Sequence, residues 1–185
     1  MCGRFYIAPD DPELEAIIAQ AKNGSTLKRG EIFPADCLAA ITAQKQVCVM
    51  RWGFPRFDGR GLIINARSET AADKPAFRQA LAQSRCLIAA SNYFEWQKQE
   101  NKKIKQAICL PDSKTLFLAG LYKHNNETGE PVFVILTRPA WTGIEFIHDR
   151  MPVILPPAIH EQWLGLANHK EVFNRAINEV QFRTC

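Results

Sequence analysis

Residues 86–110, CLIAASNYFEWQKQENKKIKQAICL, decide the fold class of this chain. They contain three short runs of apolar or alternating residues, at 86–90, 93–97 and 104–110, and such runs are typical of β-strands. A short polar segment at 99–103 joins the last two runs, which indicates a hairpin of antiparallel strands. Seven further runs of the same character lie at 3–7, 38–42, 47–52, 62–65, 116–121, 132–137 and 151–155.

Three segments have the periodicity of amphipathic helices. The first is predicted over residues 12–21, because an Asp–Pro pair starts the pattern and an Asn–Gly pair ends it. The second is predicted over 75–84, and the third begins at the two prolines 156–157. Many short strands and few helices predict an α+β fold, in which a mostly antiparallel sheet curls into a barrel-like core with flanking helices.

The composition is that of an ordinary globular protein, with 46% hydrophobic and 23% charged residues. It excludes disordered, collagen-like and coiled-coil proteins. No repeat, low-complexity tract or linker divides the sequence, so we expect one domain over residues 1–185. The net charge of +4 permits a polyanionic partner without requiring one.

The sequence carries no targeting signal and no membrane-spanning segment of ~20 apolar residues. We therefore expect a cytoplasmic protein that does not act at a membrane. Its six cysteines are scattered and form no C-x-x-C pair, so most of them are expected to be reduced thiols.

Cys2 directly follows the initiator Met1, and a residue this small in second place normally allows Met1 to be removed. Removal would expose an α-amine beside a thiol. With a pKa near 7.7–8.0, roughly 10–15% of that amine is uncharged at neutral pH, against under ~0.1% of an ordinary lysine amine. Such an amine can form a Schiff base with an aldehyde, and the thiol can then close a stable five-membered thiazolidine. The alternative is that a cysteine in second place has no role.

Several polar residues interrupt or directly follow apolar strands, where burying a polar group that has no hydrogen-bond partner costs free energy. Asn65 and Arg67 lie on one side of a strand end, Glu95 lies between two aromatic residues, and His148 and Arg150 precede a strand. An apolar setting raises the pKa of a carboxyl group such as Glu95 towards values useful for acid–base chemistry. Taken singly, each of these residues could instead be a turn cap, a member of an ion pair or a surface charge.

Together the segments resemble the SOS-response-associated peptidase (SRAP) family, whose members shield abasic sites in DNA. The resemblance rests on five motifs in the family's order and at similar separations, and one motif alone would be weak evidence. The motifs are MCGRF at 1–5, RWGF at 51–54, INARSET at 64–70, YFEW at 93–96 and HDRMPV at 148–153.

The resemblance implies the SRAP fold and covalent capture, by Cys2, of abasic sites in single-stranded DNA. Asn65, Glu95 and His148 match the other active-site residues of the family. Glu95 would open the closed sugar to its aldehyde, His148 would move protons at the sugar and the carbinolamine, and Asn65 would orient the amine or a phosphate.

A second group of residues is expected to bind the DNA. Arg4, Arg67 and Arg150 fall where the family contacts the DNA backbone or shapes the site. Exposed aromatic residues would stack on bases or wedge the strand. These are Phe33 with its neighbour Pro34, Trp52, Phe54 and Trp96. No metal or cofactor is expected, and the protein is expected to be a monomer.

Two features depart from the family pattern. Residues 30–35, GEIFPA, stand where many members have an N-V-A-P-like turn, so an Asn that helps to form the pocket is missing, and the chain ends at Cys185, earlier than many relatives. A cluster of lysines at 98, 102, 103 and 105 occupies a predicted hairpin tip. This cluster is either a solvated face, which is the commoner case, or a further DNA contact.

Three other functions remain open on the sequence. In a peptidase or autopeptidase, Cys2 would be the nucleophile and His148 the base. Glutamine amidotransferases with an N-terminal cysteine also begin M-C-G, although the other four motifs favour SRAP. In a non-catalytic module that binds single-stranded nucleic acid, Cys2 would be inert. A lyase-like activity at abasic sites is a further possible consequence of Schiff-base chemistry.

Overall fold

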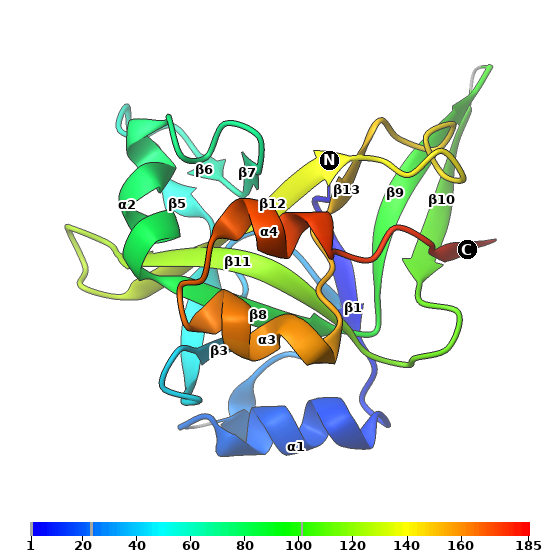
Figure 1. Ribbon diagram of the computed structural model, residues 1–185. Helices are drawn as coiled ribbons and strands as arrows, with labels where there is room; N and C mark the ends of the chain where they lie inside the picture. The colour runs from blue at the N-terminus through cyan, green and yellow to red at the C-terminus, as the bar shows by residue number, and fades with distance from the viewer. Residues whose placement is uncertain (1, 23, 101) are drawn as a thin grey trace.

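A computed structural model describes residues 2–22, 24–100 and 102–185, and its central feature is a closed barrel (Figure 1). Five strands follow one another around the barrel, and it closes because the first of them also pairs with the last. In order they are β11 (Leu116–His124), β8 (Arg85–Ala90), β3 (Cys37–Thr42), β4 (Val47–Trp52) and β12 (Pro131–Pro139). Two short strands, β13 (Arg150–Pro152) and β7 (Asn65–Arg67), pair with β12.

A second sheet of five antiparallel strands lies beside the barrel. Its order is β14 (Gln181–Thr184), β10 (Lys102–Cys109), β9 (Asn92–Gln99), β1 (Phe5–Ile7) and β2 (Gly30–Ile32). The hairpin of β9 and β10 projects from the body of the molecule (Figure 1). Two-residue strands β5 (Phe54–Pro55) and β6 (Leu62–Ile63) form a small third sheet.

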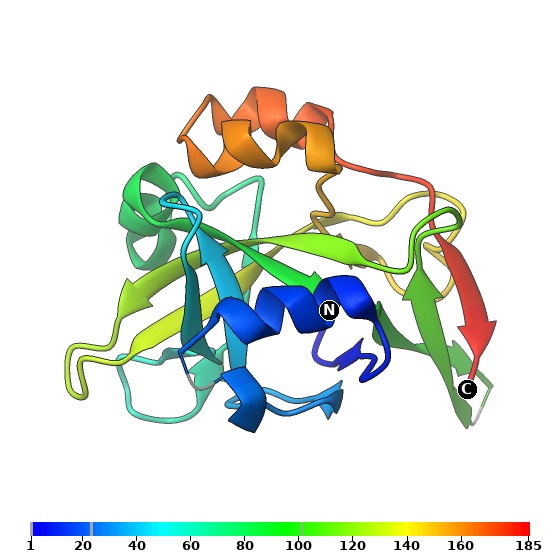
Figure 2. The same cartoon turned by 90° about the horizontal axis from the view of Figure 1, so that it is seen from below.

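The helices flank the strands. α1 (Pro12–Gln20) begins after Asp11, whose carboxylate accepts hydrogen bonds from the backbone N–H groups of Glu13 and Leu14. The other helical segments are η1 (Gly24–Thr26), α2 (Pro75–Gln83), η2 (Pro157–Ile159), α3 (His160–Leu164) and α4 (His169–Asn174). Figure 2 shows α3 and α4 together on one side of the barrel, with α1 on another. In the described part of the chain, no helix is long and apolar enough to cross a membrane.

The structure confirms the predicted α+β fold with a mostly antiparallel, barrel-like core. It adds two parallel pairings that the hairpin pattern did not indicate, those of β12 with β4 and with β7. The single strand predicted at 62–65 is divided into β6 and β7 at Ile64. The Ile64 carbonyl accepts hydrogen bonds from Trp52 Nε1 at 3.0 Å and from the Ile135 N–H at 3.1 Å, so this residue connects the small sheet to the barrel.

Candidate active site

Cys2 is fully buried where the start of the chain meets the end of the barrel. Asn65 Nδ2, on β7, donates a hydrogen bond to the Cys2 carbonyl at 2.9 Å. The Cys2 thiol lies 3.9 Å from the Arg4 carbonyl, which also accepts a hydrogen bond from the Phe94 N–H. The first and third motifs, 63 residues apart, therefore meet at Cys2. The role of Met1 lies outside the described residues.

Glu95, on β9, belongs to the same site. Its side chain is almost fully buried, and this burial raises its pKa to about 7. Burial also raises the pKa of the Cys2 thiol, and the charge of Glu95 is the next cause, which places the two groups close together. Glu95 can therefore exchange a proton near neutral pH beside a thiol that stays protonated.

His148 approaches Glu95 from the loop before β13. Its Nε2 lies 4.0 Å from Glu95 Oε2, and its Nδ1 accepts a hydrogen bond from the Arg150 N–H at 3.0 Å. Asp149 Oδ1 lies 2.8 Å from the same Nδ1, and this contact would require a proton on Nδ1. Burial lowers the pKa of His148, which favours the neutral ring. The tautomer with its proton on Nε2 satisfies the Arg150 contact and turns that proton towards Glu95, whereas the tautomer with its proton on Nδ1 satisfies the Asp149 contact.

Two buried polar atoms of the site make no hydrogen bond within the described residues. They are Asn65 Oδ1 and the Tyr93 hydroxyl. Burial raises the pKa of Tyr93, and the charges of Cys2 and Glu95 raise it further, so its hydroxyl faces the same site. Polar atoms of this kind are costly unless a ligand satisfies them. We did not single out Tyr93 from the sequence, although strand alternation puts it on the same face of β9 as Glu95.

Arg150 is a buried residue that supports the site. Its guanidinium forms a bidentate pair with Glu69 and donates to the Thr137 carbonyl at 2.7 Å. The hydrogen bonds from Arg150 lower the pKa of Glu69 to about 2. Of the two roles expected for Arg150, contact with DNA or shaping of the site, its burial fits the second. It fixes the loop that carries His148.

Replacing Arg150 with alanine should lower the free energy of unfolding by about 2 kcal/mol, because Thr137 loses a donor and Glu69 loses its charged partner. The part-exposed Glu69 can be rehydrated, which limits the loss. Glu69 has a lowered pKa in the folded protein, so its contribution is present above about pH 4.5 and is lost as the pH falls towards 2. Urea unfolding at neutral and acidic pH measures both effects.

The exposed Arg67 is the control, and its replacement with alanine should leave the stability nearly unchanged. Equal stability of Arg150→Ala and the wild type would contradict the structural role of Arg150.

Trp52 and Phe54 lie in the core, so the prediction that they are exposed for stacking on bases is wrong. The Trp52 ring stacks on Phe133, at a centroid distance of 6.3 Å, and packs against Phe5. Its indole N–H can be buried without cost because it reaches the Ile64 carbonyl. The RWGF motif therefore anchors the segment that leads into Asn65.

The other expected DNA contacts are at least partly accessible. Phe33 is exposed, and Pro34 and Trp96 are half-buried. The Arg4 guanidinium lies over the Phe33 ring at 4.3 Å and over the Trp96 ring at 4.9 Å, and it also pairs with Glu31. Arg67 is exposed at the end of β7, two residues after Asn65.

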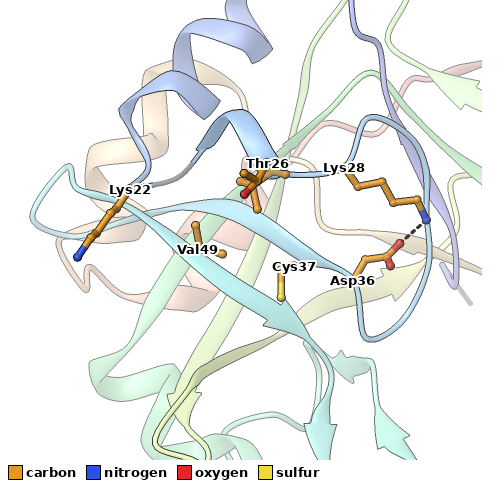
Figure 3. Close-up of a pocket in the computed structure, with 7 residues that line it drawn as sticks. Lys22, Thr26, Lys28, Asp36, Cys37 and Val49 are labelled. Carbon is orange, nitrogen blue, oxygen red and sulfur yellow. Dashed lines mark hydrogen bonds and ion pairs between the residues drawn. The ribbon is translucent and has the colours of Figure 1, made fainter.

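An open pocket of about 390 Å³, which the sequence did not indicate, lies away from Cys2. Figure 3 shows the residues that line it. Lys28 and Asp36 form an ion pair at 2.7 Å on one side of it, and Cys37 and Val49 also line it. Burial raises the pKa of the Cys37 thiol, so it is not an activated nucleophile. The residues predicted to have an acid–base function lie instead around Cys2.

Comparisons with known proteins identify the family. The family model for the SOS response associated peptidase (SRAP) matches residues 1–183. The abasic site processing protein YoqW of Bacillus subtilis is 35% identical over 91% of this chain and 82% of its own length. The abasic site processing protein YedK of Escherichia coli is 26% identical over 100% of this chain and 87% of its own length.

The fold is also found in solved structures. A protein from Bacteroides thetaiotaomicron superimposes with a TM-score of 0.84 at 23% identity, over 99% of this chain and 91% of that protein. The family model covers nearly the whole sequence, and all five motifs lie within it. The chain therefore belongs to the SOS response associated peptidase family.

Proposed function

We propose that this protein captures abasic sites in single-stranded DNA through a covalent thiazolidine bond to Cys2, after Met1 has been removed. The observation that carries the proposal is the position of Cys2, whose carbonyl is bound by Asn65 Nδ2 at 2.9 Å beside the buried Glu95. This arrangement holds Cys2 near a carboxyl group whose pKa is about 7. The names of the relatives, abasic site processing proteins, point to the same substrate.

The reaction would proceed in four steps. Glu95 donates a proton to the ring oxygen of the closed sugar while the anomeric hydroxyl gives up its proton to His148, so the ring C–O bond breaks and the sugar opens to the aldehyde. The Cys2 amine adds to the aldehyde carbon and gives a carbinolamine. The carbinolamine loses water, with His148 as the proton carrier, and becomes an imine. The Cys2 sulfur then adds to the imine carbon while the thiol proton passes to nitrogen. The adduct therefore has the mass of protein plus DNA minus one water.

The state of the Cys2 thiol favours this chemistry over peptide hydrolysis. A peptidase needs a thiolate, which a neighbouring imidazolium or another positive group stabilises by lowering the thiol pKa. Burial has the opposite effect on Cys2, and its thiol contacts the Arg4 carbonyl. His148 lies against Glu95 and Asp149. A neutral thiol that closes onto an imine needs no such activation, because the imine is itself a strong electrophile.

The direct test is to incubate the processed protein with a single-stranded oligonucleotide that carries one abasic site, and to measure the intact mass under denaturing conditions. We expect one adduct, at the summed mass minus one water. A matched pair of preparations isolates the amine: one keeps an N-terminal extension, and in the other a protease removes the extension to leave Cys2 first. Only the second should form the adduct. An adduct on the extended chain, or no adduct on the processed one, would refute the proposal.

A further inference from the structure

The second sheet has a face on which two cations cover aromatic rings, Lys105 over the buried Phe94 and Arg4 over the half-buried Trp96. Strand alternation puts Phe94 and Trp96 on this face and Glu95 on the opposite one. Lys105, opposite Trp96 on β10, holds its Nζ 3.9 Å from the centre of the Phe94 ring. Arg4 lies over the Trp96 ring at 4.9 Å. Two cations beside the half-buried Trp96 ring combine positive charge with an aromatic ring, as surfaces that bind a single strand without sequence preference do.

Glu31, on β2, joins two of these cations. One carboxylate oxygen accepts a hydrogen bond from Arg4 at 3.1 Å, and the other pairs with Lys105. All three side chains are partly exposed, at 33% for Glu31, 30% for Arg4 and 23% for Lys105. The hydrogen bond from Lys105 and the positive charges of both partners lower the pKa of Glu31. Glu31 is thus ionised at neutral pH and is paired with both cations.

We infer that Glu31 is a built-in competitor for DNA phosphate: it holds Arg4 and Lys105 in the unbound protein and thereby sets the affinity for the strand around the abasic site. This inference rests on the proposed function. A carboxylate bound by two cations resembles a phosphate bound by the same pair, since both offer two negative oxygens. A phosphate that reaches these cations must displace Glu31 or lie beside its charge.

A second acidic residue near this face, Asp36, also pairs with a cation. Lys28 lies over the Phe33 ring at 4.6 Å and pairs with Asp36 (Figure 3). Asp36 also accepts a hydrogen bond from the Phe33 N–H at 2.9 Å, so it holds the turn in shape as well. The side-chain hydrogen bonds of Glu31 in the described structure all come from the two cations. Glu31 can therefore be replaced with the least effect on its surroundings.

The test compares Glu31→Gln with the wild type in binding an undamaged fluorescent single-stranded oligonucleotide, followed by anisotropy over a salt series. At about 50 mM salt, the variant should bind about fivefold more tightly, as expected when two part-exposed ion pairs need not be broken. The log–log salt dependence should steepen by about 1.4, because each of two freed cations adds about 0.7 on a single strand. The control is Glu161→Gln on α3, which removes an equal charge from the exposed pair that Glu161 forms with Lys45.

A double variant shows where the gain arises. Lys105→Met should weaken binding by itself, and in the Glu31→Gln background it should reduce the fivefold gain to about twofold, because Arg4 alone is then released. Unchanged or weaker binding by Glu31→Gln, or a gain matched by Glu161→Gln, would overturn the inference. These measurements use undamaged DNA and need no crosslink. A missing crosslink on abasic DNA would therefore refute the proposed function without changing the outcome of the Glu31 test.

Discussion

A Cys2→Ser variant should lose the denaturant-stable adduct with abasic DNA, by at least about a hundredfold in yield, while it still forms an imine that borohydride can trap. Serine is small enough to permit removal of Met1, and it keeps the α-amine. Its hydroxyl is a much weaker nucleophile than a thiol, so the imine is not closed into a stable ring. The amine is therefore expected to form the bond to DNA. The sulfur is expected to determine how long that bond lasts.

Intact-mass measurement with and without the reductant separates the two stages. Cys37→Ser is the control, because Cys37 is an exposed free thiol outside the site and its loss should change neither product. A stable adduct on Cys2→Ser would show that attachment occurs elsewhere. Loss of the reducible imine as well would show that the thiol is needed in the first step, which contradicts the proposed order of bond formation.

A Glu95→Gln variant should form the adduct about a hundredfold more slowly, the size of effect expected when a general acid is removed. The amide has nearly the same shape but cannot donate a carboxyl proton to the sugar ring oxygen. Binding of undamaged single strands should change little, because Glu95 is buried behind the face that carries the cations. Equal losses of binding and of rate would show that Glu95 has a structural role.

The pH profile gives a second measurement of the same residue. The reaction needs protonated Glu95, whose pKa is about 7, and an uncharged amine, whose pKa is near 8. The rate should rise with pH up to about 7 as the amine loses its proton, stay level up to about 8, and then fall as the remaining protonated Glu95 is lost. In Glu95→Gln the fall at high pH should disappear. A fall that persists in the variant would assign the acid to another group.

The fold was largely predictable because its strands and helices carry local signals. The Asp–Pro start of α1 is an example, since capping by Asp11 depends on neighbouring residues alone. β14 and β2 were missed for the opposite reason. Both are short edge strands, and β14, exposed throughout, forms by pairing with β10 about 70 residues earlier in the chain. Pairing over such distances leaves no local pattern of burial.

Most residues of the candidate site could be named from the sequence, but less could be inferred from it about the role of each one. A buried arginine and an exposed one look alike in sequence, and the partners that bury Arg150 lie 81 and 13 residues away. The same limit applies to Trp52, whose burial depends on the Ile64 carbonyl. The departure at residues 30–35 showed that an Asn of the family was missing, but only the structure shows that Glu31 contacts two cations.

The strand that follows Cys2 has a mechanical consequence. β1 is three residues long and is held between β2 and β9, with Phe5 fully buried. If the DNA is joined to the backbone nitrogen of Cys2, any motor that pulls on that DNA applies its force directly to β1. Peeling so short a strand would expose Phe5 to water long before a covalent bond in the adduct breaks. The end of the protein that carries Cys2 would therefore be the first part to unfold under such a load.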